Sequence, residues 1–257
     1  MRLVFDRGTI LLLEPPSGLE PTGFPGALWD VRVRAHRAPA FRSDALRAWL
    51  ARRGVAFADE IQSAPAPAGA WTSPELRPYQ DAALSAWELA GRRGIVVLPT
   101  GSGKTRIAVA AMARARAATL CLVPTRALLA QWQHAIADAY AGPVGCFGDG
   151  RRELCPVTVA TFESAYRWMG KLGNRFDLLV VDEVHHFGCN LRDEALEMST
   201  AGARLGLTAT PPSDAAAICP SRPPRRADRL RARDPGPHWA LPRRPRRDHA
   251  PARADAA

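Results

Sequence analysis

The sequence predicts an α/β protein: a parallel sheet with helices on both faces, preceded by a small α/β domain and followed by a disordered tail. Three observations predict it. Within 75–212, short continuous apolar runs alternate with helical patterns, as in strands buried on both faces. Within 1–61, turn signals separate runs that alternate apolar and polar residues. Within 213–257, eleven arginines and eight prolines accompany only three Leu, Ile, Val or Phe residues, too few for a core.

The small N-terminal domain, 1–61, is expected to pair strands around one helix. Its predicted strands are 9–13, 28–33 and 55–57. Ser43 is the expected N-cap of a helix over 44–53, and Gly54 is expected to end it. Residues 62–74 contain three prolines among small residues, which predicts an extended, solvated linker between this domain and the main unit.

The main unit, 75–212, is expected to alternate strands and helices. Its predicted strands are 94–98, 119–123, 158–160, 178–181 and 204–207, and its predicted helices are 79–90, 104–114, 126–139, 162–169 and 191–198. Parallel sheets of this kind bind ligands at the carboxyl ends of their strands. Polar residues that directly follow a predicted strand are therefore the first candidates for a functional site.

Charge and cysteine content narrow the class of protein. The net charge is +10, but residues 213–257 hold eleven arginines and five aspartates, so the rest of the chain is only mildly basic. A mildly basic charge is compatible with nucleic-acid binding but does not require it. No apolar run is long enough to span a bilayer, and Asp6, Arg7 and Glu14 argue against a signal peptide. Five cysteines without a Cys-x-x-Cys pair predict reduced thiols in a cytoplasmic protein.

A phosphate-binding loop is indicated by Leu98-Pro-Thr-Gly-Ser-Gly-Lys-Thr105, which follows a predicted strand and opens a predicted helix. Its two glycines would let backbone amides turn toward phosphate oxygens. Lys104 would reach the β- and γ-phosphates of ATP, and Thr105 would bind Mg²⁺. The loop residues expected to hold the nucleotide are Thr100, Gly101, Ser102, Gly103, Lys104 and Thr105. Leu98 replaces the first glycine of the strict pattern, and the alternative is a glycine-rich turn capping an ordinary helix.

Two adjacent acids end the apolar run 178–181. Asp182 stands at the carboxyl end of this strand, where it would hold Mg²⁺ through water. Glu183 is then the candidate for orienting and activating the attacking water, which makes it the expected general base. His185 would lie beside the pair and could couple it to a neighbouring element. The alternative is a strand that ends in a solvated acidic turn.

These motifs together resemble those of superfamily 2 helicases and translocases of the DEAD/DEAH type. The resemblance rests on Pro-Thr-Gly-Ser-Gly-Lys-Thr, Asp-Glu-Val-His and Thr208-Ala-Thr210. Asp-Glu-Val-His-His, the small N-terminal α/β domain and Leu76-Arg-Pro-Tyr-Gln80 look most like the XPB-like branch of DNA repair helicases. The motifs cover 76–212 and imply a P-loop NTPase (RecA-like) motor domain that uses ATP and Mg²⁺.

The resemblance assigns roles to further residues. Gln80 matches the glutamine that recognises adenine, with Arg77 as its companion. The motifs that touch the nucleic-acid backbone match Thr125, Arg126 and Thr161. Thr208 and Thr210 match the motif that links ATP hydrolysis to strand movement. The alternatives are a polar residue on an amphipathic helix for Gln80, helix N-caps for Thr125 and Thr161, and loop threonines for the last pair.

Helicases of this class use two motor domains, and the second supplies arginine fingers. The tail after Pro212 holds no such motif, so we expect the first domain only, with hydrolysis impaired unless a second domain or subunit supplies the arginines. The change in composition after residue 212 suggests an out-of-frame tail. The resemblance favours DNA over RNA as the partner, and no membrane. The alternatives are a non-catalytic nucleotide- and nucleic-acid-binding module and a truncated gene product.

Overall fold

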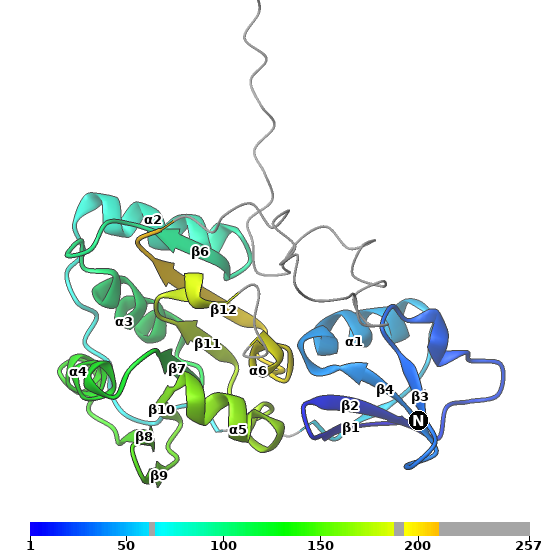
Figure 1. Ribbon diagram of the computed structural model, residues 1–257. Helices are drawn as coiled ribbons and strands as arrows, with labels where there is room; N and C mark the ends of the chain where they lie inside the picture. Colours follow the sequence, from blue (N-terminus) through cyan, green and yellow to red (C-terminus); the bar gives the residue numbers. More distant parts are fainter. Residues whose placement is uncertain (62–64, 188–192, 211–257) are drawn as a thin grey trace, which may run out of the picture.

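The computed structural model describes residues 1–61, 65–187 and 193–210, so the predicted tail over 213–257 lies outside the described residues. Within the described ranges the chain forms two sheets that lie side by side, each with its own helices (Figure 1). No helix in these ranges is long and apolar enough to cross a membrane.

The N-terminal unit, residues 1–61, is a five-stranded sheet with one helix packed on it. The strand order is β3-β4-β2-β1-β5, antiparallel except for the parallel pair β1 and β5. Its elements are β1 (Arg2–Asp6), β2 (Thr9–Leu13), the 3-10 turn Pro21–Gly23, β3 (Leu28–Asp30), β4 (Ala35–Pro39), the 3-10 turn Ala40–Arg42, α1 (Ser43–Arg52) and β5 (Ala58–Asp59). Leu3, Ile10 and Leu12 of the strands form a core with Leu46 and Leu50 of α1.

Several predictions for this unit need correction. The strand at 9–13 is confirmed, but the one expected over 28–33 ends at Asp30, and 55–57 is not a strand. Strand β5 begins only at Ala58, where it pairs with β1. Ser43 is not the N-cap of α1: it is the first helical residue, and its hydroxyl donates to the backbone oxygen of Thr200 at 3.5 Å. Gly54, with φ +65°, follows the helix as predicted.

The main unit is a seven-stranded sheet in the order β6-β12-β11-β7-β10-β8-β9, parallel except for β9. Its strands are β6 (Arg93–Val97), β7 (Thr119–Val123), β8 (Val144–Gly148), β9 (Arg151–Glu153), β10 (Val157–Thr161), β11 (Leu178–Val181) and β12 (Ala203–Thr208). Its helices are α2 (Pro78–Leu89), α3 (Lys104–Ala115), α4 (Arg126–Ala137), α5 (Phe162–Leu172) and α6 (Asp193–Glu197), with a 3-10 turn at Val184–His186.

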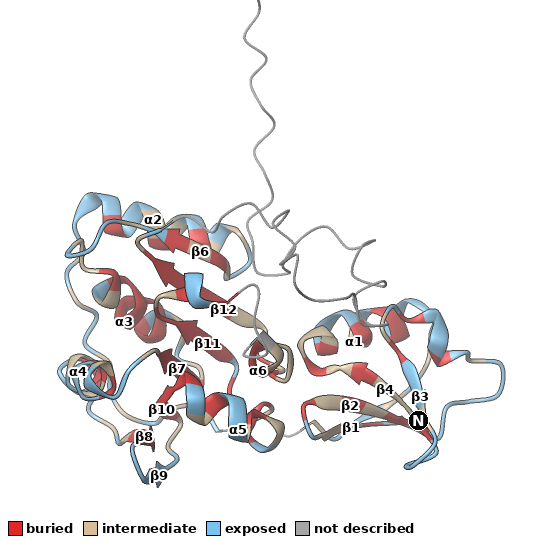
Figure 2. Ribbon diagram, viewed as in Figure 1, coloured by how far each residue is buried: buried red, intermediate tan, exposed pale blue. Residues whose placement is uncertain are grey.

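The central strands are buried on both faces, as their continuous apolar runs predicted (Figure 2). Successive side chains of a strand point to opposite faces. Cys121 and Val123 of β7 therefore join the core beneath α2, α3 and α4. Leu120 and Leu122 of the same strand join the core beneath α5 and α6. This arrangement confirms the predicted parallel sheet with helices on both faces.

The predicted linker is not free over its whole length. Trp71 stacks on Tyr140, with ring centroids 4.5 Å apart, and forms an isolated β-bridge with it. The backbone N–H of Thr72 donates to the backbone oxygen of Ala139 at 2.8 Å. The two rings shield each other from water, which explains why this stretch packs against the end of α4 instead of being solvated. Residues 62–64 lie outside the described ranges.

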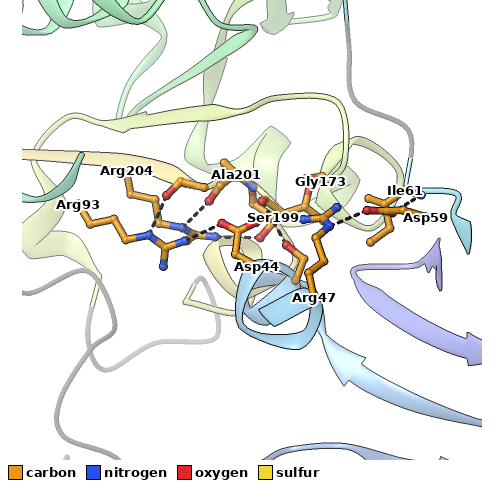
Figure 3. A network of polar contacts seen from close by, with 12 residues as sticks. Asp44, Arg47, Asp59, Ile61, Arg93, Gly173, Ser199, Ala201 and Arg204 are labelled. Atoms are coloured by element: carbon orange, nitrogen blue, oxygen red, sulfur yellow. Dashed lines mark hydrogen bonds and ion pairs between the residues drawn. The ribbon is translucent and has the colours of Figure 1, made fainter. Parts of the chain in front are cut away.

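A polar network joins the two units (Figure 3). Asp44 of α1 accepts from Arg93 of β6 at 3.3 Å and from Arg47 at 3.0 Å. Arg93 also donates to the backbone oxygen of Gly202 at 2.7 Å. The N-terminal unit therefore rests on the first residue of β6 and on the segment before β12, at the edge of the sheet opposite the strands' carboxyl ends.

Candidate functional site

The loop predicted to bind phosphate, residues 98–103, lies between β6 and α3. Gly101 and Gly103 have φ of +80° and +79°, a left-handed conformation that favours glycine. A Cβ on Gly103 would also meet the side-chain amide of Gln80. Thr100 and Gly101 are exposed, whereas Ser102 and Thr105 are half-buried. The backbone therefore has the shape that lets amides at the start of α3 face an anion.

Lys104 lies inside this loop and is almost completely buried. Its Nζ donates to the backbone oxygens of Leu98 at 3.0 Å and Pro99 at 3.4 Å. These neutral acceptors satisfy part of the ammonium's hydrogen-bonding capacity without forming an ion pair with it. The hydroxyl oxygen of Ser102, in the same loop, is buried without a hydrogen bond.

Gln80 contacts the loop from α2. Its Nε2 donates to the backbone oxygen of Ser102 at 2.8 Å, and its Oε1 accepts from the backbone N–H of Arg77 at 2.9 Å. Tyr79 donates its hydroxyl to the same Ser102 oxygen at 2.8 Å, a contact that the sequence did not indicate. The structure thus brings Gln80 against the loop, while Arg77 is exposed at the start of α2.

Asp182 directly follows β11, and the residue is almost completely buried. Its Oδ2 accepts from the indole N–H of Trp132 at 2.9 Å, and its Oδ1 accepts from the backbone N–H of Glu183 at 3.0 Å. Burial raises the pKa of the Asp182 carboxyl, and the indole hydrogen bond opposes this rise. The charge of Lys104 also lowers that pKa.

Glu183 and His185 lie in the turn after Asp182, and His185 contacts the end of β12. His185 Nδ1 is 3.0 Å from Thr208 Oγ1. The Thr208 hydroxyl donates to the backbone oxygen of Thr210 at 3.0 Å, an arrangement that suits a tautomer with its proton on Nδ1. Glu183 Oε2 lies 3.3 Å from the same Nδ1, within ion-pair distance, and is buried without a hydrogen bond. His185 therefore contacts both the acidic turn and the end of a neighbouring strand, and its coupling role stays a prediction.

The predicted nucleic-acid contacts lie at the starts of α4 and α5, at the same edge of the sheet. Thr125 Oγ1 accepts from the backbone N–H of Leu128, and Thr161 Oγ1 accepts from that of Ser164, both at 3.3 Å. Both threonines thus act as N-caps, the alternative that the sequence left open. Arg126 is exposed and forms an ion pair with Asp149 at 3.0 Å. The turn at 148–150, which sequence reasoning missed, packs against Thr161.

Families of known proteins match both units. Residues 73–213 match the family described as type III restriction enzyme, res subunit. Residues 3–61 match the xeroderma pigmentosum group B helicase damage recognition domain.

Two curated relatives and one solved structure were compared with the chain. DNA 3'-5' translocase XPB2 of Sulfurisphaera tokodaii is 38% identical over 191 residues, which cover 74% of this chain and 43% of that protein. DNA 3'-5' helicase XPB of Mycobacterium tuberculosis is 36% identical over 53% of this chain and 26% of that protein. The chain therefore spans less than half the length of these relatives.

The solved structure is the Sulfolobus solfataricus SWI2/SNF2 ATPase core in complex with dsDNA. It superposes with a TM-score of 0.50 at 19% identity, over 55% of this chain and 33% of that one, a likeness that supports the fold alone. Together with the motifs, the family matches show that the chain belongs to the type III restriction enzyme Res-subunit family and is an XPB-like member of superfamily 2.

Proposed function

We propose that this chain is the first motor domain of an ATP-dependent DNA helicase or translocase, and that it binds ATP with Mg²⁺ at the carboxyl edge of its main sheet. One observation carries the proposal. Four buried side-chain polar atoms in the described part of the chain have no hydrogen bond, and two of them, Ser102 Oγ and Glu183 Oε2, lie in the loops that carry Lys104 and Asp182. Buried polar atoms without partners are rare and call for a ligand or water.

The residues present fit a nucleotide with its metal ion. Lys104 would exchange its two carbonyl acceptors for the β- and γ-phosphates. The Thr105 hydroxyl and the Asp182 carboxylate are the oxygen ligands that Mg²⁺ prefers. Mg²⁺ would neutralise charge on the transferring phosphoryl group. Glu183 would orient and activate the attacking water, and Gln80 with Arg77 would recognise the adenine.

Turnover by this chain alone is expected to be slow. The aligned part of this chain covers only 43% of its XPB2 relative, and a second motor domain or another subunit would supply the arginine fingers. Losing such an arginine costs on the order of 10³–10⁵ in rate. A binding module that depends on another subunit for hydrolysis is the second candidate.

DNA is proposed as the partner, because the curated relatives carry DNA helicase and translocase names. The starts of α4 and α5 offer backbone amides and the Arg126 guanidinium to the phosphates. The capping threonines Thr125 and Thr161 would hold these helix ends in place. We expect His185, Thr208 and Thr210 to pass changes at the ATP site to this surface.

The nucleic-acid proposal predicts the salt dependence of binding. Replacing Arg126 with alanine should weaken binding of labelled single-stranded DNA and lower the slope of log affinity against log salt by about 0.7. Fluorescence anisotropy at several salt concentrations measures both quantities. Arg175→Ala is the control, because this arginine is exposed just before the amino end of β11. Equal slopes for Arg126→Ala and the unmutated chain would remove Arg126 from the interface, and tighter binding of matched RNA would contradict the choice of DNA.

A further inference from the structure

Trp132 occupies an unusual position for a core tryptophan. Trp132 lies in the middle of α4. Its side chain is fully buried in the core that α2, α3 and α4 form against the sheet. A buried indole needs one acceptor for its N–H. Trp132 finds it in the carboxylate of Asp182, 50 residues further along the chain, at 2.9 Å.

The second buried tryptophan of this core gives a comparison. Trp87 of α2 donates its indole N–H to the backbone oxygen of Arg204, also at 2.9 Å. A backbone carbonyl is the ordinary acceptor for such a group. Trp132 instead uses a carboxylate that the proposed function assigns to Mg²⁺, so its hydrogen bond does more than satisfy a buried donor.

The hydrogen bonds of Asp182 account for its orientation. A carboxylate offers about four lone-pair positions on two oxygens. The indole occupies one position on Oδ2, and the Glu183 backbone N–H occupies one on Oδ1. One position on each oxygen is left for water or a cation. An arginine or lysine partner would cancel the negative charge of the carboxylate. Because an indole is neutral, it fixes the carboxylate and leaves that charge available.

We propose that Trp132 is a positioning residue that holds the Asp182 carboxylate ready for Mg²⁺, an inference that rests on the proposed function. Carboxylates that bind metals are commonly oriented by hydrogen bonds from a surrounding shell, and losing such a partner costs about 10–100-fold in metal affinity or activity. The same helix begins at Arg126, so one rigid element joins the proposed nucleic-acid surface to the metal-binding carboxylate.

The test compares Trp132→Phe with Trp87→Phe. Each variant keeps an aromatic ring in the core and loses one indole hydrogen bond. The affinity for a fluorescent ATP analogue is measured with Mg²⁺ and with a chelator. Trp132→Phe should weaken Mg²⁺-dependent binding about tenfold or more and leave binding in chelator unchanged. Trp87→Phe should change neither affinity.

A second measurement uses the unmutated chain and does not depend on the folding of a variant. In a ¹H–¹⁵N spectrum, adding Mg²⁺ to the nucleotide-bound chain should shift the indole resonance of Trp132 and leave that of Trp87 in place. An unmoved Trp132 resonance, or the same Mg²⁺ dependence in both variants, overturns the inference while the proposed function stands. An unmutated chain that binds no nucleotide under either condition overturns the proposed function and the inference with it.

Discussion

Replacing Lys104 with alanine is expected to weaken ATP binding by about 30-fold to several thousand-fold, corresponding to about 2–5 kcal/mol. The reason is electrostatic: the ammonium is almost completely buried, and only neutral carbonyl groups accept its hydrogen bonds. A phosphate would therefore meet a positive charge that is poorly screened by water. Equilibrium binding of a fluorescent ATP analogue measures the loss, and circular dichroism checks that the variant is folded.

The chain offers a matched control, because Lys171 is its one other lysine. Lys171 is exposed on α5, with its Nζ 5.1 Å from the centre of the Trp168 ring. Lys171→Ala should bind ATP as the unmutated chain does, and equal affinities for the two variants would refute the phosphate site. The same samples report hydrolysis: strong DNA-stimulated turnover that Lys104→Ala abolishes would contradict the proposal that arginine fingers come from elsewhere.

Replacing Arg204 with methionine is expected to destabilise the fold by about 3–5 kcal/mol. This arginine, at the start of β12, is almost completely buried and donates to three backbone oxygens, those of Leu196 at 3.0 Å, Ser199 at 2.8 Å and Ala201 at 3.1 Å (Figure 3). Methionine keeps most of the apolar stem but removes the donor to all three oxygens, and the oxygen of Leu196 keeps only its 3.4 Å contact with the backbone N–H of Ser199. The segment that they belong to also supports the N-terminal unit, through the contact of Ser43 with Thr200. Urea unfolding measures the loss.

The pKa of Arg204 predicts that this loss does not depend on pH near neutrality. Burial lowers the pKa of its guanidinium from the ordinary value of 12.5 to about 9. The group therefore stays protonated in both the folded and the unfolded chain at neutral pH, and the loss should be the same at pH 6 and pH 8. Arg151→Met is the control, because Arg151 is exposed and forms an ion pair with Glu153 at 2.9 Å; it should cost less than about 0.5 kcal/mol. Equal losses for the two variants would refute the role assigned to Arg204.

Local patterns in the sequence were enough to predict the central sheet. The strands 119–123 and 178–181 were predicted with the bounds that the structure has, because continuous apolar runs between turns leave little choice of state. Strands β1 and β4 of the N-terminal sheet, and the hairpin of β8 and β9, were missed. Their short runs contain charged or glycine residues, and pairing with a neighbour decides their state.

Contacts between distant residues could not be predicted. Ser43 has the residue type of an N-cap, but its hydroxyl turns to Thr200, 157 residues away. From the sequence alone, Arg204 is expected to be exposed at the surface. The backbone oxygens that accept its hydrogen bonds come together around it only in the folded chain. The helical pattern of α4 predicts that Trp132 lies on a buried face. It does not predict the hydrogen bond from Trp132 to Asp182, which also joins distant residues. The sequence indicated which strand ends carry the site, whereas the hydrogen bonds that hold its side chains depend on tertiary packing.

The most direct test of the ATP site is a crystal structure of the chain with a non-hydrolysable ATP analogue and Mg²⁺. We expect the β-phosphate against the backbone amides of 101–105 with Lys104 Nζ turned toward it, and the metal between the Thr105 hydroxyl and Asp182. The Asp182 carboxylate should keep its hydrogen bond from Trp132. Phosphates bound away from this loop, or a metal that Asp182 does not reach directly or through water, would contradict the account.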